Sequence, residues 1–437
     1  MILKTFKAME INIPHVHKIE GDAGFWAKVT KEGKVEELKM QTHLGLRQIE
    51  GILVGRKVKD VPLVVSRICG ICPVVHILNG TVALEKALGI GVSPETVLLR
   101  KLFLASQIIQ SNALHLFFMA LPDFLNIEND LKLSEKFPKE SEAAMKMRDY
   151  ALAITEIIGG RVVHPVTPRV GGFSKAPDKK EFEKLLNGYP EVLKGALLLA
   201  EKLGEIDYPD FNRETVFASL YSEKEYPYYQ SELMKIGEEK ISIGDFYSNK
   251  IEEDFKNPPV KKVTFKGKEY MLGSIARIKN NGKLLNPKAK EVLSRFIRKR
   301  NLKEGEFFNN VFYNLFCQAV EAVHFTEESQ KLLKEAISFN SVSSNAAAPV
   351  NAKGKGAAGL SAMEAPRGTL FDYFETDKEG RVSHCNIITP TAQFLNNLEH
   401  DLKTLLPKLV DLPAEERIKK VRSLVRVYDP CISCATH

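Results

Sequence analysis

Cysteine is scarce in this chain, which has 6 cysteines among 437 residues. So few cysteines in so long a chain do not form the disulfide framework of a small secreted protein, and they indicate a reducing, cytoplasmic setting. The P-loop signature is absent as well. The sequence therefore contains no sign of a bound nucleoside triphosphate.

Long uninterrupted apolar runs are also missing. Lysine and polar residues interrupt the most apolar stretch, residues 98–121, which fits a buried bundle helix better than a membrane span. Residues 1–10 lack an apolar core followed by a cleavage site, so we expect no secretory signal.

A strong excess of one charge is absent too. The chain has 62 basic and 55 acidic residues, for a net charge of +7. Without an arginine-rich arm or a long basic block, nucleic-acid binding has no support. A chain that is 44% hydrophobic and 27% charged is of ordinary globular composition and is long enough to bury a large core.

Two Cys-x-x-Cys pairs stand near opposite ends of the chain. Cys69 and Cys72 form the first pair, and Cys431 and Cys434 form the second, just before His437. This spacing lets both thiolates of a pair bind one metal, and four thiolates suit zinc, an iron–sulfur cluster or a late transition metal. A zinc ribbon separates its pairs by only about 15–20 residues. Here the whole fold must bring the pairs together, so we predict a buried metal centre.

Simpler interpretations of the paired cysteines are a structural zinc site and a redox dithiol. A redox motif generally occurs once, at a helix start within a βαβ unit, so two pairs fit it poorly. A long-range zinc site stays open as the alternative. The remaining Cys317 and Cys385 lie in apolar segments, and we expect both to be buried hydrophobic residues.

The hydrophobic pattern predicts a mainly α fold with smaller α+β parts, in which a bundle of long helices is flanked by N-terminal and C-terminal β elements. Helices are predicted at residues 47–56, 74–88, 93–122, 139–158, 179–203, 287–299, 309–337 and 392–406. Strands are predicted within residues 11–42 and 369–388, with a further hairpin at residues 263–270 and a loop at residues 341–359.

The cysteine pairs predict one interlocked unit over residues 1–437, because both ends of the chain must meet. Its expected parts are residues 1–73 with N-terminal β elements and the first pair, residues 74–206 with the helix bundle, residues 207–280 as a peripheral α+β excursion, residues 281–340 with further helices, and residues 341–437 with the C-terminal β and helical region and the second pair.

Several short motifs accompany the cysteine pairs in a fixed order. They are Ile19-Glu-Gly21, Arg67-Ile-Cys69-Gly-Ile-Cys72, Gly159-Gly-Arg-Val-Val-His-Pro165 with Gly171-Gly172, Glu364-Ala-Pro-Arg-Gly368, Ile388-Thr-Pro-Thr391 and Asp429-Pro-Cys431-Ile-Ser-Cys434. Over essentially its whole length the chain resembles the large, catalytic subunit of a [NiFe] hydrogenase. Pro73 after the first pair and the Cys-Ile-Ser-Cys ending look most like the cytosolic bidirectional, sulfhydrogenase and coenzyme-reducing group.

The resemblance implies reversible conversion of H2 into protons and electrons at a nickel–iron centre whose iron carries carbon monoxide and cyanide. Cys69 and Cys431 would be terminal nickel ligands, and Cys72 and Cys434 would bridge the two metals. Thiolates suit this centre because they are soft donors and also bases. The resemblance implies that the proton first goes to a terminal thiolate, that of Cys431.

Glu20 resembles the family's next proton acceptor. A carboxyl group near thiolates and away from water has a raised pKa, which suits proton relay near neutral pH. The simpler interpretation is a surface glutamate before a turn. Arg367 resembles an arginine that lies over the metals, hydrogen-bonds a cyanide and polarises the open coordination position.

Other site residues are implied in the same way. Pro366 and Asp429 would line the space over the metals, and Thr391 would donate its hydroxyl to the second cyanide, although each alone is ordinary turn chemistry. His76 would donate a hydrogen bond to a bridging sulfur. Where some respiratory relatives carry an aspartate, this chain has Ser111. For His115 and His164 we expect packing or hydrogen-bonding roles.

Glu50, the backbone carbonyl of Ile387 and His437 match the residues that bind a magnesium ion in the family. Relatives are made with a C-terminal extension that is cut after this histidine, so the resemblance implies a mature form. The simpler interpretation of Glu50 is a carboxylate on a helix surface.

The resemblance also implies partners. Outside the two pairs only Cys317 and Cys385 remain, too few for a cubane cluster, so iron–sulfur clusters are expected only in a small partner subunit. Further electron-transfer subunits of diaphorase, ferredoxin-linked or heterodisulfide-linked type are expected, with H2 as the substrate and the cytoplasm as the location. The alternatives are a non-catalytic relative of the complex I type, which lacks the four thiols, and a zinc-stabilised scaffold protein.

Overall fold

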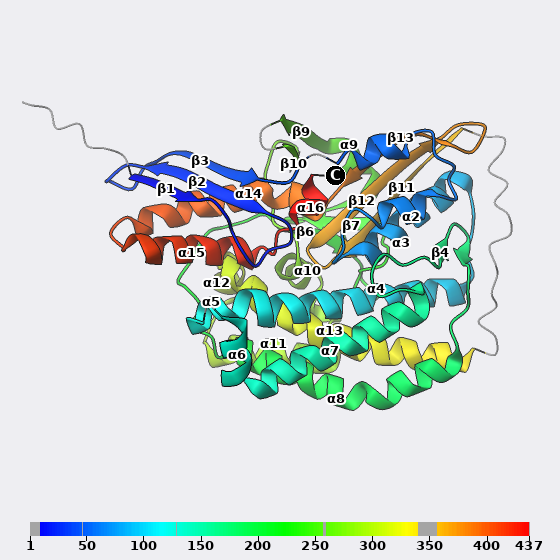
Figure 1. Ribbon diagram of the computed structural model, residues 1–437, viewed down its shortest axis with the longest axis horizontal. Coiled ribbons are helices and arrows are strands. Elements are labelled where there is room, and N and C mark those ends of the chain that lie inside the picture. The colour runs from blue at the N-terminus through cyan, green and yellow to red at the C-terminus, as the bar shows by residue number, and fades with distance from the viewer. Residues whose placement is uncertain (1–8, 46, 128, 257–258, 340–355, 437) are drawn as a thin grey trace, which may run out of the picture.

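The computed structural model describes residues 9–45, 47–127, 129–256, 259–339 and 356–436. Long helices form one layer of the molecule, drawn in the lower half of Figure 1. They are α4 (Pro94–Leu114), α7 (Pro138–Gly159), α8 (Lys179–Gly204) and α13 (Asn314–Ser338). Each packs against at least two of the others, and their apolar faces form a continuous core.

Helix α4 shows why the bundle forms. The side chain of Ser93 accepts a hydrogen bond from the backbone N–H of Thr96, and Pro94 takes the first helical position, where its missing N–H costs nothing. A π-helical turn (His115–Ala120) and α5 (Leu121–Leu125) continue it. Among the described helices this is the one long and apolar enough to cross a membrane, but 83% of the apolar window is buried inside the protein. It is a core helix, as its interrupted apolar pattern predicts.

Antiparallel sheets lie above the helix layer in Figure 1. The N-terminal sheet contains β1 (Met9–Ile13), β2 (Ala23–Val29) and β3 (Val35–Thr42). The C-terminal sheet contains β11 (Ala357–Ala365), β12 (Gly368–Thr376) and β13 (Val382–Ile388). The remaining strands are β4 (Pro168–Arg169), β5 (Gly172–Phe173), β6 (Ala218–Tyr221), β7 (Leu233–Ile236), β8 (Glu239–Ser242), β9 (Lys250–Lys256) and β10 (Pro259–Phe265).

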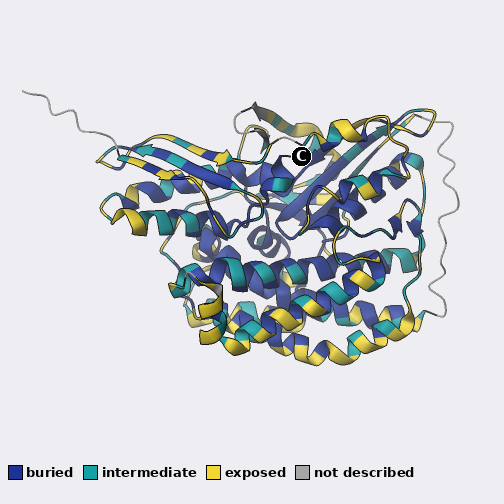
Figure 2. Ribbon diagram, in the orientation of Figure 1, coloured by how far each residue is buried: buried dark blue, intermediate teal, exposed yellow. Residues whose placement is uncertain are grey.

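Helix α3 (Pro73–Leu88) packs on β11 and β12, and its N-terminus carries the first cysteine pair. Gly359 of β11 permits this close approach. A Cβ at this position would lie 2.1 Å from the carbonyl oxygen of Ala83 and 2.5 Å from the backbone nitrogen of Ala87. Figure 2 shows the buried residues gathered between the sheets and the helix layer, with exposed residues on the outer faces of α7 and α8.

Gly359 is also the last glycine of residues 354–359, Gly-Lys-Gly-Ala-Ala-Gly, which have the glycine spacing of a dinucleotide-binding loop. That loop follows a strand and opens a helix, because the helix N-terminus holds the pyrophosphate. Here residues 357–359 open strand β11 instead. The spacing is therefore not a nucleotide-binding fingerprint in this fold.

Shorter helices surround these layers. They are α1 (Ile49–Leu53), α2 (Val61–Val65), α6 (Asp130–Lys136), α9 (Ile243–Asn249), α10 (Ser274–Asn281), α11 (Pro287–Lys299), α12 (Glu304–Asn309), α14 (Pro390–Leu405), α15 (Ala414–Val427) and α16 (Ile432–Ala435). Helix α16 lies at the centre of Figure 1, where the C-terminal segment enters the molecule between the two sheets.

The mainly α architecture with smaller sheets confirms the predicted fold class. Some elements differ from the prediction. Strand β10 pairs with the preceding β9, whereas residues after Lys266 and Gly267 contribute only an isolated bridge, so the predicted hairpin at residues 263–270 is wrong. Both turn residues have positive φ, and the chain leaves the sheet there. Residues 357–359, expected in a loop, begin β11, and the rest of that expected loop lies mostly outside the described residues.

Candidate active site

The first cysteine pair is fixed where the chain enters α3. Cys72 is the N-cap residue of this helix, and the backbone N–H groups of Ile71 and Cys72 donate to Cys69 Sγ at 3.3 and 3.4 Å. The side-chain oxygen of Gln107 accepts hydrogen bonds from the N–H groups of the first helical turn, those of Val74 at 2.6 Å and Val75 at 3.2 Å. Gln107 therefore satisfies N–H groups of the helix start that the Cys72 side chain does not cap.

The second pair is held by contacts with distant parts of the chain. Cys431 is the N-cap residue of α16, and its backbone N–H donates to the hydroxyl of Thr391 at 3.0 Å. The N–H of Ile432 donates to the carbonyl of Glu20 at 3.0 Å. Arg47 donates to the backbone carbonyls of Ser433 and, at 2.6 Å, Ile68, so it joins the segments of both pairs.

The four thiols meet in one buried cluster. Their sulfur atoms all lie within 4.8 Å of one another, and each cysteine is at most 3% exposed. Cys431 Sγ is 2.7 Å from Cys434 Sγ and 3.6 Å from Cys69 Sγ, and Cys72 Sγ is 3.4 Å from Cys434 Sγ. The structure thus brings together all four predicted metal ligands from the two ends of the chain.

Burial and mutual hydrogen bonding set the protonation of the cluster. Burial raises the pKa of the Cys431 and Cys434 thiols well above the usual range. Hydrogen bonds from the other thiols, first that of Cys431, lower the pKa of Cys69 well below it. A metal that binds here must therefore displace protons, as is general for thiolate sites.

Glu20 lies directly beside the cluster. Its Oε2 is 2.9 Å from Cys431 Sγ and accepts the backbone N–H of Ser433 at 3.0 Å. Its Oε1 accepts the Ser433 hydroxyl at 2.5 Å. The side chain is half-buried, so it connects the buried thiol with the outside of the site. The interpretation of Glu20 as a mere surface residue is wrong, because α16 fixes its carboxylate on the sulfur.

Arg367 lines a small cavity together with cysteines of the cluster, and it is paired with Asp429. Arg367 Nε donates to the backbone carbonyl of Asp429 at 2.5 Å, and its Nη2 donates to Asp429 Oδ1 at 2.8 Å. Burial opposes the charge of Arg367, but Asp429 and the thiols, first Cys431, raise the pKa of the guanidinium above its usual range. Arg367 Nη1 is buried and has no hydrogen-bond partner among the described residues. A small cavity here is lined by Pro366, Arg367, Thr391, His76 and cysteines of both pairs.

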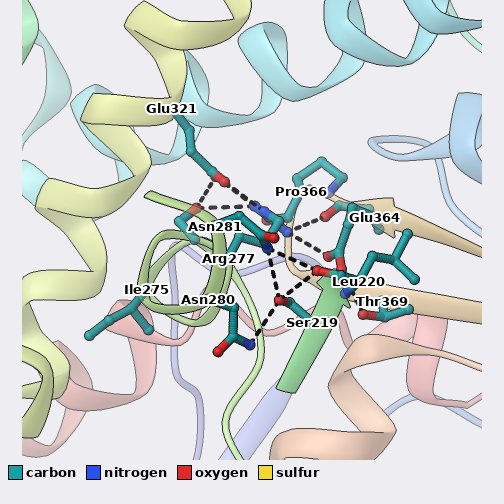
Figure 3. A network of polar contacts seen from close by, with 12 residues as sticks. Ser219, Leu220, Ile275, Arg277, Asn280, Asn281, Glu321, Glu364, Pro366 and Thr369 are labelled. Atoms are coloured by element: carbon teal, nitrogen blue, oxygen red, sulfur yellow. Dashed lines mark hydrogen bonds and ion pairs between the residues drawn. The ribbon is translucent and has the colours of Figure 1, made fainter. Parts of the chain in front are cut away.

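A buried ionic network holds the turn that carries Arg367 (Figure 3). Arg277 of α10 pairs with Glu321 at 2.6 Å and with Glu364 at 3.0 Å. The same guanidinium donates to the carbonyls of Ala365 at 2.9 Å and Pro366 at 3.0 Å. These bonds fix the backbone between β11 and β12. No motif marks Arg277 in the sequence, because it is a lone arginine whose partners are far along the chain.

The histidines predicted near the site differ in their contacts. His76 of α3 is buried with its Nε2 at 3.5 Å from Cys434 Sγ. His115 bonds through Nδ1 to Gln318 Oε1 at 2.8 Å and through Nε2 to the carbonyl of Arg426 at 2.9 Å. His164 Nδ1 lies 2.8 Å from the carbonyl of Ser66. The last two are hydrogen-bonded packing residues, as the sequence predicts.

Cys317, Cys385 and Ser111 are buried as well, and none belongs to the thiol cluster. Cys385 Sγ lies 3.4 Å from the carbonyl oxygen of Glu50. Burial raises the pKa of the Cys317 thiol well above the usual range and that of Cys385 to about 12. Both cysteines are therefore inert hydrophobic residues, as the sequence predicts.

The predicted magnesium ligands are brought together in part. Glu50 Oε1 accepts the backbone N–H of Ile387 at 2.7 Å. The ammonium of Lys261 lies between them, 2.7 Å from Glu50 Oε1, 2.9 Å from Asn386 Oδ1 and 3.5 Å from the carbonyl oxygen of Ile387. His437 lies outside the described residues. Oxygen atoms of Glu50, Asn386 and Ile387 thus surround a positive charge at this position. The sequence analysis did not predict Lys261 there.

Comparison with known proteins assigns the family. Residues 47–143 and 189–437 match the family model described as nickel-dependent hydrogenase. The chain belongs to the nickel-dependent hydrogenases. It is 32% identical to the alpha subunit of sulfhydrogenase 1 from Pyrococcus furiosus over 445 residues, 98% of either chain. It is 24% identical to the beta subunit of the NAD-reducing hydrogenase HoxS from Cupriavidus necator, over 97% of this chain and 94% of the other.

Solved structures agree on the fold of this hydrogenase. A crystal structure of an NAD+-reducing [NiFe]-hydrogenase in the H2-reduced state superposes with a TM-score of 0.86 at 23% identity, covering 98% of this chain and 99% of the other. The [NiFeSe] hydrogenase of Desulfovibrio vulgaris Hildenborough in the reduced state gives a TM-score of 0.77 at 21% identity, covering 98% and 100%. The hydrogenase is an oxidoreductase with the large-subunit fold, which decides against the zinc-stabilised scaffold.

Proposed function

We propose that this hydrogenase cleaves H2 reversibly at a nickel–iron centre held by Cys69, Cys72, Cys431 and Cys434. The observation that supports the proposal is the contact of Glu20 with Cys431, because its carboxylate, which can accept a proton, lies 2.9 Å from a sulfur that we propose as a metal ligand. When bound, the centre supplies heterolytic cleavage of H2. A purely structural zinc site has no use for a carboxylate on a ligand sulfur, and neither has a non-catalytic relative of the complex I type.

The residues of the chain supply proton transfer and orientation. The proton moves from Cys431 Sγ to Glu20 Oε2 across 2.9 Å, within the distance that general acid–base catalysis requires. Ser433 holds the carboxylate at both oxygens, so it faces the sulfur before any proton arrives. Because Glu20 is half-buried, the proton can continue toward solvent without crossing the core.

Arg367 fits a centre whose iron carries cyanide and carbon monoxide. Its Nη1 is a buried donor that lacks a partner among the described residues, although the other two guanidinium nitrogens are bonded to Asp429. A cyanide nitrogen would accept this hydrogen. The Thr391 hydroxyl already accepts the Cys431 N–H, so its own proton could be donated to a second cyanide. Pro366 lines the same cavity and excludes water, and His76 would donate to Cys434.

The position that the Lys261 ammonium occupies, between Glu50 and the Ile387 carbonyl, would suit magnesium if Lys261 moved away. Glu50, the Ile387 carbonyl and His437 would bind the ion, and Lys261 would give up its place to it. A carboxylate and a carbonyl are the hard oxygen donors that magnesium prefers. Without the ion, Lys261 neutralises Glu50 in its place.

Electrons leave through partner proteins in this proposal. The cysteines outside the cluster are separate and buried, so the described residues hold no second cluster of thiols. The relatives are named as single subunits of larger enzymes, one an alpha and the other a beta subunit. We therefore infer a small subunit with iron–sulfur clusters, further electron-transfer subunits that deliver to a soluble acceptor, and a cytoplasmic location.

Glu20→Gln tests the function in the purified native complex. Removal of the acceptor should lower H2 oxidation about 10²–10⁴-fold, the range for general acid–base groups. Nickel and non-cluster iron, measured by elemental analysis, should stay in equal amounts. Glu10→Gln, at an exposed position of β1, is the matched control and should leave turnover unchanged. Full activity of Glu20→Gln would remove Glu20 from the proton route, and zinc in place of nickel in the wild type would refute the function itself.

A further inference from the structure

A second group of metal-binding side chains lies outside the thiol cluster. His15 and Asp22 lie in the connection between β1 and β2, near its two ends, and His43 follows β3. Each offers one ligand atom, and the three atoms lie within 4.8 Å of one another. We propose that His15, Asp22 and His43 form a site for a divalent transition metal of the zinc type, with water completing the coordination. The site is separate from the proposed nickel–iron chemistry and does not depend on it.

The donor set matches this class of metal. Two imidazoles and one carboxylate are ligands that zinc uses with bonds of about 2.0–2.2 Å, and an open water position is common in three-ligand sites. Ligands on such a tetrahedral ion lie about 3.4 Å apart, as those bond lengths require. The ligand atoms lie within 4.8 Å of one another, so each pair needs to approach by at most about 1.4 Å. No thiolate or carboxylate cage is present in the group, which argues against a copper(I) or calcium site.

The backbone around the group is already fixed. The N–H of Val16 donates to the carbonyl of Ala23 at 2.7 Å, and that of His43 donates to the carbonyl of Asp22 at 3.1 Å. Two arginines of α15 also hold the connection, through hydrogen bonds to the backbone carbonyls of His15 at 3.2 Å and His17 at 2.7 Å. Ligands on a fixed scaffold lose little conformational entropy when an ion binds.

Gly24 of β2 leaves the space in which the group meets. A Cβ at this position would lie 2.7 Å from the carbonyl oxygen of Pro14 and 3.0 Å from His43 Nε2. The backbone conformation of Gly24 is not left-handed, so the requirement for glycine is one of space. The imidazole of His43 reaches across the strand only because no side chain stands there.

Contacts within the group also favour a cation. His15 Nδ1 lies 3.0 Å from Asp22 Oδ1, and the rings of His15 and His43 are 5.0 Å apart. The hydrogen bond with His15 lowers the pKa of Asp22, so its carboxylate is ionised and ready to bind. His43 Nε2 now bonds the Pro14 carbonyl at 2.7 Å, a bond that it would exchange for the ion. Side-chain exposures of 52% for His15 and 42% for Asp22 let a hydrated ion reach the site.

Glu20 lies on the same connection, two residues before Asp22. An ion that links the connection to the end of β3 would therefore fasten the segment that carries this glutamate. The ion would stabilise the folded state by mass action, since the ligands are brought together only there.

Equilibrium dialysis of the purified native complex against zinc, followed by elemental analysis, tests the site. Zinc is the chosen probe because neither the nickel–iron centre nor iron–sulfur clusters contain it. The double variant His15→Gln/His43→Gln should bind one zinc fewer per complex than the wild type. Asp22→Asn should weaken binding by more than about tenfold, since even the loss of residues that only orient ligands costs about 10–100-fold.

His400→Gln is the matched control. This exposed histidine also pairs with a carboxylate, that of Glu269, but the pair does not belong to a described three-ligand group, so the variant should bind as much zinc as the wild type. Unchanged nickel content will show that each variant is folded. Equal zinc in the wild type and the double variant would overturn the proposal.

Discussion

At the scale of single residues, Asp372 is a buried carboxyl group outside the site whose surroundings disfavour charge. It lies in β12, is fully buried, and neither carboxylate oxygen has a well-formed hydrogen bond among the described residues. Burial raises the pKa of Asp372 well above its usual range, and the nearby amide of Asn79 opposes this rise only in part. A charged aspartate in such surroundings is costly, so burial favours the neutral form of Asp372.

Asp372→Asn should therefore change how stability depends on pH. The folded-state pKa of Asp372 lies above the unfolded value of about 3.9, so the wild type is most stable below that pH and loses stability as pH rises toward the folded pKa. Asparagine stays neutral and avoids this loss, which amounts to about 1.4 kcal/mol per pH unit between the two pKa values. The melting temperature of the variant should rise relative to wild type from about pH 4 upward, as measured by calorimetry of the complex.

Asp411→Asn is the control for this prediction. Asp411 is exposed, so its substitution should not change how the melting temperature depends on pH. A melting-temperature difference between Asp372→Asn and wild type that stays constant with pH would contradict the neutral aspartate.

Site residues divide by the kind of information that the sequence carries. Spacing alone marks Cys69 and Cys431 as metal ligands, whereas Glu20 and Arg367 are predicted from short motifs that resemble the hydrogenase family. The structure places these side chains around one point. Lys261 could not be predicted in this way. It is one of many lysines, and only the folded chain shows that it faces Glu50 and the Ile387 carbonyl.

At the scale of elements, the contact of α3 with β11 positions the first cysteine pair. Gly359 is buried at this contact, where the helix backbone approaches the strand. Gly359→Ala should destabilise the protein by about 1–3 kcal/mol or more, the usual cost of overpacking, because its Cβ meets backbone atoms that cannot rotate away. The measurement is the melting temperature of the complex together with its nickel content, which should also fall as α3 shifts.

Gly188→Ala provides a control of opposite sign. Gly188 lies inside α8 with nothing within 4 Å of an added methyl group, so alanine should stabilise the helix by about 0.5–1 kcal/mol. If the melting temperature of Gly359→Ala equals or exceeds that of the wild type, then α3 and β11 can move apart without a loss of stability.

Helices and strands could be predicted where their own residues carry the signals of capping and apolar periodicity. The long helices α4, α7 and α8 carry caps and a 3.6-residue apolar period, and the structure confirms them close to their predicted bounds. Strand β11 was missed because the small residues at its start are typical of a loop. They are small because α3, which is distant in sequence, packs closely against them. Helix α15 was missed because most residues of its first two turns are charged and none of them is buried.

At the scale of the whole molecule, the two ends of the chain build one centre. Contacts with the C-terminal segment come from Glu20, Arg47 and Thr391, which belong to distant parts of the sequence. The Glu20 and Cys431 backbones even form an isolated parallel bridge. We propose on this ground that residues 1–437 are one interlocked unit, as the spacing of the cysteine pairs predicts. The position of this meeting point could not be predicted, because it depends on how all the intervening layers pack.

Arg47 offers a test of how the two cysteine segments are kept together. Its guanidinium donates to the carbonyls of Arg67 at 3.4 Å, Ile68 at 2.6 Å and Ser433, so one side chain joins the residues before Cys69 to those after Cys431. Methionine retains much of the side-chain volume but none of these hydrogen bonds. Charge-assisted hydrogen bonds contribute about 1.5–3 kcal/mol each, and carbonyls left buried without a donor add to the loss.

Arg47→Met should therefore release the second pair from the first and lower nickel retention by at least about tenfold, the effect of losing groups that orient metal ligands. The measurement is nickel per complex after dialysis against a chelator. Arg56→Met is the matched control, because Arg56 Nε donates a local, exposed hydrogen bond, to the carbonyl of Ile52 four residues earlier. Nickel retained equally by both variants would mean that the contacts of Glu20 and Thr391 hold the C-terminal segment in place without Arg47.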